Sequence, residues 1–252
     1  MKFKKIPIKK DYLPPSEEEL DFLNHYSQMV AIDDRYASFI LENYYMMKGY
    51  AGSNINMYAR EALLKKLEFG LKFLEPNYTL VLFDAFRGRA TQLSLYNDFY
   101  SQIKIRNPHL SDKLLHEETK KFVAHPDDRG RFPVAPHNSG GAIDLSIRYG
   151  EQTLDMGTEF DDLTDLAQSN YFEQNFIEGI GFTRERWLEV RANRRLLFNL
   201  MKVLGFTNYE YEWWHFDLGN CLWGSALNTP WIFKSAEEEV KRLCAESTTL
   251  AQ

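Results

Sequence analysis

Apolar residues recur at helical spacing along two long segments of the chain. Within residues 56–74 the repeating positions are Leu63, Leu64, Leu67, Leu71 and Leu74. Within residues 184–204 they are Trp187, Val190, Leu197, Met201 and Leu204. Apolar residues three or four positions apart predict an amphipathic helix, and Pro76 and Gly205 mark the ends of these two helices.

Residues suited to helix ends predict three further helices. Ser16 precedes three glutamates, and acidic residues suit the positive end of a helix. A helix over residues 90–105 would end before the Asn-Pro pair that begins at position 107. Ser235 and Glu238 have the spacing of a capping box at the start of a C-terminal helix.

Runs rich in β-branched and aromatic residues predict the strands. These runs cover residues 29–32, 79–83, 142–147 and 209–218. Residues 125–139 are rich in Pro, Asp and Gly and predict a long loop. Because helices and strands mix without regular β-α-β alternation, we expect an α+β fold with a small mixed or antiparallel central sheet and flanking helices.

The chain has 252 residues, of which 44% are hydrophobic, which is enough for one large domain with a substantial core. We expect residues 1–28 to form an N-terminal extension and residues 29–252 to form the domain. The charged stretch up to Pro15 is expected to lie on the surface.

Charge and hydropathy narrow the choice of partners. The net charge of −6, without a basic stripe, argues against a nucleic-acid partner. No segment approaches the ~20 apolar residues of a membrane span, and the Lys-rich start lacks the apolar run of a signal peptide. We therefore expect a cytoplasmic protein without a nucleic-acid or membrane partner; a homo-oligomer stays open.

Candidate chemistry begins in the segment from His137 to Asp144, which reads His-Asn-Ser-Gly-Gly-Ala-Ile-Asp. The two glycines allow a tight turn that can bring His137 over the strand carrying Asp144. Strand alternation points Asp144 away from Ile143 and Leu145, so it faces a cleft if those two face the core. An Asp that caps a turn and a surface His are an equally good interpretation of this segment alone.

The second candidate segment is a Glu-Trp-Trp-His run that ends at His215. Its aromatic residues would form a low-dielectric wall that raises the pKa of Glu212, as suits a general base. An edge strand with an outward Glu and a hydrogen-bonded core His is the alternative.

Two imidazoles, a carboxylate and a second nearby carboxylate are the set that a catalytic zinc needs. The ligands would be His137, Asp144 and His215.

Four other residues are weaker candidates. Arg87 follows a predicted buried strand, where an Arg can bind a carboxylate or stabilise an oxyanion, although an ion pair with Asp84 is the more usual role. Asp161 and Asp162 are candidates to hold a substrate ammonium group, although such residues more often cap loops. His125 is the only other histidine near the main cluster.

These motifs together resemble the D-alanyl-D-alanine dipeptidases of the VanX type, which are zinc peptidases with the D,D-carboxypeptidase and Hedgehog-like fold. The resemblance rests on the H-x-x-G-x-A-x-D segment at 137–144, the E-W-W-H run at 212–215 and the D-x-F-R run at 84–87. Their order and spacing match over residues 30–220, and the doubled Trp favours the dipeptidase branch.

The resemblance implies a role for each candidate residue. One Zn²⁺ per chain would bind to His137, Asp144 and His215. Glu212 would be the general base, and Arg87 would stabilise the tetrahedral intermediate. Asp161 would lie near the amino terminus of the substrate, which is a free dipeptide ending in D-Ala.

Three features depart from the family pattern. Ala135 stands two residues before the first zinc His, where the family usually has Ser or Thr, so a hydroxyl that could contact the substrate is missing. Ala85 and Gly88 replace the Gly and Pro of the family's D-G-Y-R-P, and the loop over 125–136 is longer than expected. All three affect the rim of the site and therefore the substrate preference.

The implied activity is hydrolysis of D-Ala-D-Ala or a close relative, in turnover of cell-wall dipeptide or in glycopeptide resistance. Two alternatives stay open: a D,D- or L,D-carboxypeptidase that acts on peptidoglycan peptides, and a non-catalytic metal-binding module of the same fold. The absence of an export signal argues against the first, and the presence of Glu212 and Arg87 argues against the second.

Overall fold

The computed structural model describes residues 1–128 and 132–250, with side chains as far as residue 247. Residues 129–131 of the predicted loop and the last two residues of the predicted domain lie outside this part. The α-helices are α1 (Glu17–His25), α2 (Tyr44–Met47), α3 (Glu61–Leu71), α4 (Arg89–Arg106), α5 (Asp112–Lys120), α6 (Arg184–Val203), α7 (Cys221–Leu227) and α8 (Glu237–Leu250). The strands are β1 (Met29–Ala31), β2 (Ile40–Leu41), β3 (Tyr58–Arg60), β4 (Tyr78–Asp84), β5 (Ala142–Tyr149), β6 (Gln152–Thr153), β7 (Thr207–Asn208) and β8 (His215–Asp217).

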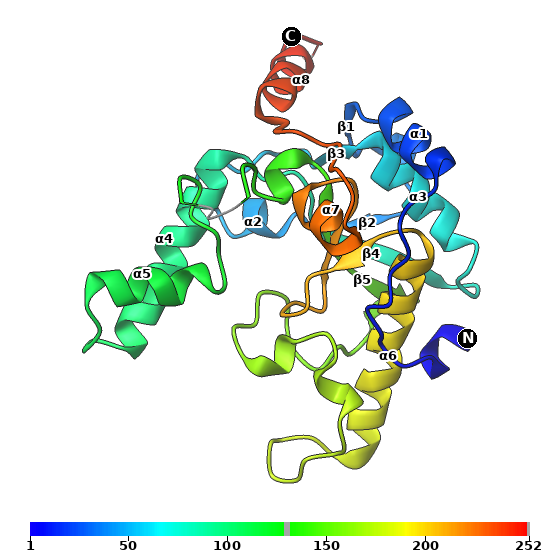
Figure 1. Cartoon of the computed structure of the whole chain (residues 1–252), viewed down its shortest axis with the longest axis vertical. Helices are drawn as coiled ribbons and strands as arrows, with labels where there is room; N and C mark the ends of the chain where they lie inside the picture. Colours follow the sequence, from blue (N-terminus) through cyan, green and yellow to red (C-terminus); the bar gives the residue numbers. More distant parts are fainter. Residues whose placement is uncertain (129–131, 251–252) are drawn as a thin grey trace.

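A mixed sheet lies at the centre of the molecule (Figure 1). Its strands run in the order β2-β4-β5-β8-β7, and β6 pairs with the end of β5. The β2–β4 pair is parallel and the other pairs are antiparallel. β1 and β3 form a separate antiparallel pair. The α+β fold with a mixed central sheet and flanking helices is therefore confirmed.

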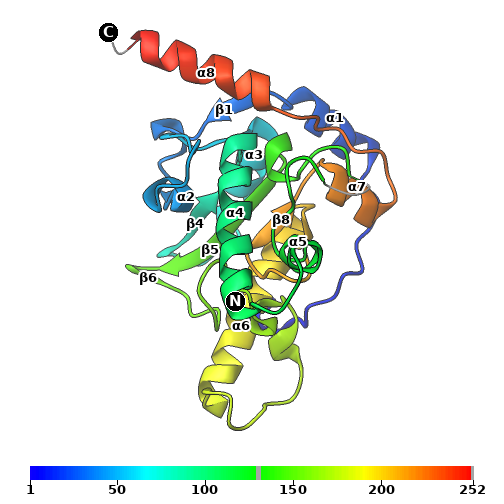
Figure 2. The same cartoon turned by 90° about the vertical axis from the view of Figure 1, so that its left-hand side faces the viewer.

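Helices cover both faces of this sheet. α4 and α5 lie on one side of β4 and β5, and α3 and α6 lie on the other (Figures 1 and 2). Ile143, Leu145 and Ile147 alternate along β5 and are fully buried in a core that they share with α3 and α6. Asp144 lies between them in sequence and lines a cavity together with Leu95 of α4. The predicted orientation of Asp144 is confirmed.

Most predicted helices occur close to their expected bounds. α1 begins after Ser16, whose hydroxyl accepts a hydrogen bond from the Glu19 N–H at 3.1 Å. The helix predicted from residue 56 instead begins at Glu61, because residues 58–60 pair with β1 as the strand β3. α5 was not predicted from the pattern; Ser111 caps it by accepting from the Leu114 N–H.

Two predictions about the C-terminal third are wrong. Only residues 215–217 of the predicted strand over 209–218 are extended in the sheet, as β8, because the preceding residues form turns. The capping box expected of Ser235 and Glu238 is replaced by other contacts. Ser235 donates to the side chain of Asn138 at 2.6 Å, and Glu238 pairs with Lys241 at 2.7 Å.

The N-terminal residues lie along α6 (Figure 1). Phe3 is 4% exposed and belongs to the main hydrophobic core. Asn199 of α6 donates to the Ile6 carbonyl at 2.9 Å. The charged stretch is therefore attached to the body of the molecule through these apolar and polar contacts.

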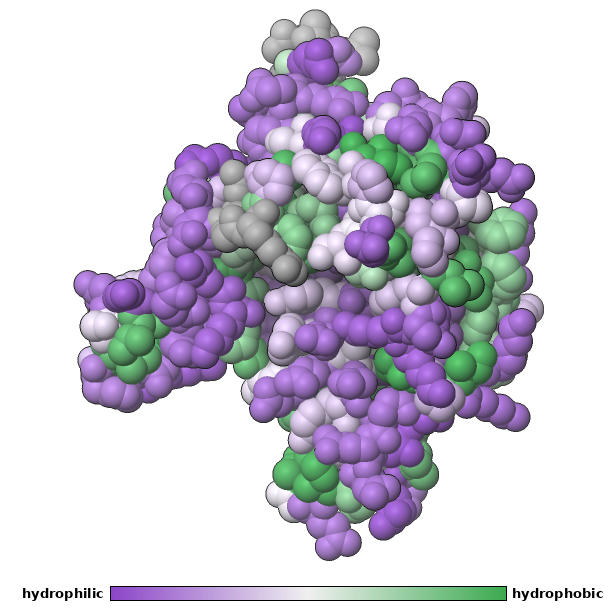
Figure 3. Space-filling view, viewed as in Figure 1, coloured by the Kyte–Doolittle hydropathy of each residue, from purple (hydrophilic) through white to green (hydrophobic). Residues whose placement is uncertain are grey.

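Hydrophilic side chains cover most of the surface in Figure 3, and apolar side chains form small separate groups. Among the residues that the structure describes, no helix combines the length and the hydropathy needed to cross a bilayer.

Candidate active site

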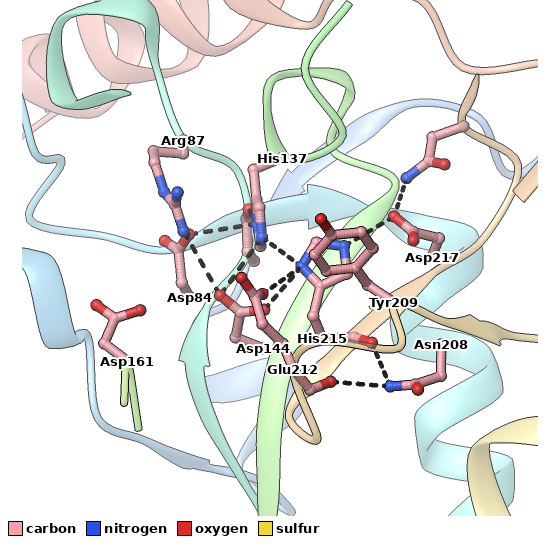
Figure 4. A network of polar contacts seen from close by, with 12 residues as sticks. Asp84, Arg87, His137, Asp144, Asp161, Asn208, Tyr209, Glu212, His215 and Asp217 are labelled. Carbon is pink, nitrogen blue, oxygen red and sulfur yellow. Dashed lines mark hydrogen bonds and ion pairs between the residues drawn. The ribbon is translucent and has the colours of Figure 1, made fainter. Parts of the chain in front are cut away.

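Three polar residues form a row across the central sheet. Asp84 at the end of β4 pairs with Asp144 of β5, and Asp144 pairs in turn with His215 of β8. His137 lies in a 3₁₀ turn over residues 137–139, which Gly140 ends with a left-handed φ of 70°. Figure 4 shows the His137 and His215 rings and the Asp144 carboxylate pointing toward one another. The sheet register and this turn bring together all three predicted metal ligands.

Each imidazole is oriented by a hydrogen bond on its outer side. His137 Nδ1 lies 2.7 Å from the Ala85 carbonyl oxygen, to which it can only donate. His215 Nε2 lies 3.0 Å from an Asp217 carboxylate oxygen. These partners assign the protons to the outer nitrogens and leave lone pairs on His137 Nε2 and His215 Nδ1, which face each other at 3.1 Å.

The donor set fits a divalent metal ion. Ligand atoms of His137, Asp144 and His215 all lie within 4.8 Å of one another, and all three residues are buried. Two facing lone pairs repel unless a proton or a cation lies between them. Asp144 Oδ1 is buried, and the neighbour that it faces is the same His215 Nδ1, at 3.1 Å, so with the His215 proton on Nε2 this oxygen also needs a cation. Two imidazoles and one carboxylate are a ligand set typical of catalytic sites.

The electrostatics of the cluster also favour a cation. Burial opposes ionisation of Asp144, but His137 and His215 hold its pKa below the ordinary value. Desolvation would lower the pKa of His215, but Asp217 and Asp144 raise it well above the usual range. Positive charge at His215 is therefore stabilised by carboxylates on two sides.

Glu212 lies beside this cluster in the turn before β8. Its Oε2 is 3.8 Å from His215 Nδ1, and its side chain is 22% exposed. Burial raises the pKa of Glu212 to about 8, although His215 opposes the shift. The turn is held by Asn208 and Ser169, which donate to the Glu212 carbonyl at 3.0 and 3.2 Å. A carboxylate with a raised proton affinity thus faces the predicted metal ligands.

Arg87 approaches the cluster from the segment that follows β4. Its guanidinium donates to Asp84 at 2.9 Å and lies 3.5 Å from Asp144 Oδ2. It also donates to the Tyr45 hydroxyl at 3.1 Å and lies over the Tyr45 ring. The predicted ion pair with Asp84 is therefore present, and it holds Arg87 in the cluster rather than away from it.

Asp161 lies apart from the imidazoles, to the left of Asp84 and Asp144 in Figure 4. Tyr45 donates to Asp161 Oδ1 at 3.1 Å, so one hydroxyl connects Asp161 with Arg87. Burial raises the pKa of Asp161 to about 7, and Arg87 opposes the shift. Tyr45 was missed from the sequence, because it belongs to the short helix α2 and to no recognisable motif.

A cavity of about 210 Å³ opens over these residues. Its polar part includes Arg87, Asp161 and Glu212, and its apolar part includes Leu95 and Val134. Ala135 and Trp214 also line the cavity, whereas His125 and Asp162 do not. The volume is below the ~300 Å³ typical of sites for drug-sized ligands, so it suits a small substrate.

A buried His–Asp–His group that could hold a metal ion shares one cavity with a carboxylate and a guanidinium. This arrangement is typical of metal-dependent hydrolases. The peptidase M15 family model, described as D-ala-D-ala dipeptidase, matches residues 17–232. The chain belongs to this peptidase family, as the resemblance predicted.

Two curated relatives support the same family. A D-alanyl-D-alanine dipeptidase from Synechocystis sp. is 29% identical over 181 residues, which are 67% of this chain and 72% of that protein. A D-alanyl-D-alanine dipeptidase from Enterococcus faecalis is 30% identical over 84 residues, which are 32% of this chain and 36% of that protein.

Proposed function

We propose that this protein is a zinc-dependent dipeptidase that hydrolyses D-Ala-D-Ala or a closely related dipeptide. The observation that carries the proposal is the pair of imidazole nitrogens, His137 Nε2 and His215 Nδ1, which face each other at 3.1 Å beside Asp144. Family membership supports the dipeptide as substrate. Zn²⁺ would be held by His137, Asp144 and His215.

Each polar residue of the cavity would have a distinct task. The ion, when bound, would polarise the scissile carbonyl and make a water molecule more acidic. Asp161 would bind the substrate ammonium group. Arg87 would stabilise the negative charge that develops on the carbonyl oxygen.

Glu212 would transfer one proton in two steps. It would accept the proton from water as the water oxygen bonds to the carbonyl carbon. It would then donate that proton to the leaving nitrogen as the carbon–nitrogen bond breaks, which releases two amino acids. A raised pKa suits both steps, because the same carboxyl group must bind the proton and release it.

The cavity volume and its lining favour a dipeptide over a longer peptide. A cavity of about 210 Å³ accommodates two alanine residues, and residues 120–124, 132 and 134–136 lie along one side of it. The cellular part of the proposal, turnover of cell-wall dipeptide in the cytoplasm or glycopeptide resistance, rests on the resemblance alone.

The test is hydrolysis by the purified, zinc-loaded protein. D-Ala-D-Ala should be cleaved faster than L-Ala-D-Ala, L-Ala-L-Ala or a pentapeptide that ends in D-Ala-D-Ala. Glu212→Ala should reduce turnover roughly 10²- to 10⁴-fold, the usual contribution of a general acid–base, with the zinc content unchanged. Glu210→Ala removes an exposed carboxylate from the same turn and should leave the rate unchanged.

Undiminished turnover by Glu212→Ala would overturn the assignment of the base. Cleavage of the pentapeptide alone would move the protein to the carboxypeptidase alternative. Zinc binding without hydrolysis of any of the four peptides would favour the non-catalytic module.

A further inference from the structure

The residues that follow the family-matched part of the chain contact the turn that carries His137. The family model ends at residue 232, and the next residues lead into α8, which packs beside β1 (Figure 2). Ala236 donates its N–H to the Asn138 carbonyl at 2.8 Å, and Ser235 donates to Asn138 Oδ1 at 2.6 Å. Asn138 directly follows His137, so this C-terminal segment holds the neighbour of a predicted metal ligand.

Glu237 links two segments of the site through a single atom. Its Oε2 accepts from Asn138 Nδ2 at 2.7 Å and from the Arg89 N–H at 3.0 Å. Asn138 is next to His137, and Arg89 lies two residues after Arg87. One carboxylate oxygen therefore spans the segment that carries the metal ligand and the segment that carries the guanidinium.

The position of Glu237 also compensates for a missing helix cap. Arg89 begins α4, and the preceding Gly88 has no side chain to accept a hydrogen bond from the first N–H groups. A negative charge at this end of an 18-residue helix interacts favourably with the helix dipole. Glu237 supplies both the acceptor and the charge, from an element remote in sequence.

A second contact of α8 fixes the same turn. Glu239 pairs with Arg60 at 2.9 Å, and Arg60 donates to the Ser139 carbonyl at 2.8 Å. Arg60 is 7% exposed, so these bonds lie largely away from water. The turn over 137–139 is thus held by α8 directly through Asn138 and indirectly through Arg60.

We propose that Glu237 is a positioning residue, which fixes the His137 turn and the Arg87 segment relative to each other. Its effect on catalysis rests on the proposed dipeptidase activity, whereas its effect on metal retention rests only on the metal site of His137, Asp144 and His215. Partners that orient metal ligands typically change metal affinity 10- to 100-fold when they are removed. Glu237 does not contact His137 itself; it acts through Asn138, which follows His137 in the chain.

The experiment compares full-length Glu237→Ala and Glu237→Gln with the wild type. Zinc release to a chromophoric chelator is followed without substrate, and kcat and KM for D-Ala-D-Ala are measured separately. We expect Glu237→Ala to release zinc about 10-fold faster and to lower kcat more than it raises KM, because the Asp161 contact is untouched. Glu237→Gln should behave like the wild type, because one amide oxygen can accept both hydrogen bonds.

Glu238→Ala is the matched control, because it removes the same charge from the next position, where Glu238 pairs with the surface residue Lys241. Wild-type zinc release and kcat in Glu237→Ala would overturn the proposal, as would equal effects in Glu238→Ala or no rescue by Gln. If Glu237→Ala does not fold, Glu237→Asp, one methylene shorter, replaces it. If the wild type cleaves no dipeptide, the proposed function fails and the zinc-release comparison still tests Glu237.

Discussion

At the scale of single residues, Asp161 combines an unusual backbone conformation with an unusual environment. Its φ of 62° lies in the left-handed region, which Asn and Asp adopt more readily than other residues with a side chain. Its carboxylate accepts from Tyr45, and burial raises its pKa to about 7. Asp161 therefore changes its charge within the pH range in which a peptidase is normally assayed.

We expect the KM for D-Ala-D-Ala to rise as the pH falls through about 7. Below that pH Asp161 becomes protonated and no longer attracts the substrate ammonium group, which itself stays charged up to a pKa of about 8. Asp161→Asn keeps the backbone conformation and removes the charge. It should raise KM roughly 10- to 100-fold at pH 8, the loss of one charge-assisted hydrogen bond, and abolish this pH dependence. Initial rates from about pH 5.5 to 8.5 measure both effects.

Asp162→Asn provides the matched control for this prediction. Asp162 accepts from the Thr164 N–H at 2.7 Å, a bond that an Asn oxygen keeps, and it does not line the cavity. Equal increases of KM in the two variants would contradict the role of Asp161. An unchanged pH dependence in Asp161→Asn would contradict it as well.

Much of the candidate site could be predicted from the sequence, because short-range patterns carry it. His137 and Asp144 belong to one turn and strand, and Glu212 and His215 belong to one run. Tyr45 could not be found, since its contacts with the site arise only from the packing of α2. Asp217 did have a signal: it lies two residues after His215, so both side chains fall on the same face of β8.

At the scale of elements, the turn before β8 explains why the strand predicted there is wrong. In a strand, Glu212 and His215 would lie on opposite faces, because they are three positions apart. The turn instead brings the Glu212 carboxylate to within 3.8 Å of His215. The turn is held by hydrogen bonds from the side chains of Asn208 and Ser169 to the Glu212 carbonyl. A pattern of apolar residues does not predict such polar contacts. Trp213 and Trp214 are consecutive and both buried, whereas Tyr211 is 52% exposed, so burial in this turn does not follow strand alternation.

The start of β5 depends on a close approach that only Gly141 permits. A Cβ at this position would lie 2.6 Å from the Leu218 carbonyl oxygen and 2.8 Å from the Phe233 ring. Gly141→Ala should therefore separate β5 from the end of β8 and lower the free energy of unfolding by about 1–3 kcal/mol, as overpacking does. Urea unfolding of the metal-free protein measures this loss.

Gly88→Ala is the comparison for this substitution. Gly88 has a φ of −66°, and a Cβ there would meet nothing closer than 3.6 Å. We expect Gly88→Ala to unfold at nearly the wild-type urea concentration. Equal midpoints for the two variants would show that the backbone contact at Gly141 relaxes without a cost.

At the scale of the whole molecule, residues at both ends of the chain hold the segments that carry the candidate site. The family model begins at residue 17, within the stretch that we expected to be an extension. Before that point, Tyr12 accepts a hydrogen bond from the Asn208 N–H at 3.0 Å. Asn208 in turn holds the carbonyl of Glu212. The N-terminal residues thus contact the turn of the candidate base, much as α8 contacts the turn of His137.

Substitution of Phe3 tests whether residues 1–28 form a separate extension or unfold together with the domain. Its ring packs in the main core near Phe73 and is 4% exposed, so Phe3→Ala should cost about 3–5 kcal/mol of unfolding free energy if this segment unfolds together with the domain. Leu13→Ala, in the same segment but 83% exposed, should change stability by less than about 0.5 kcal/mol. Urea unfolding followed by Trp fluorescence reports on the domain, because all five Trp residues lie after residue 186. A loss confined to Phe3→Ala would make the N-terminal residues part of the domain, whereas equal midpoints for both variants would support an independent extension.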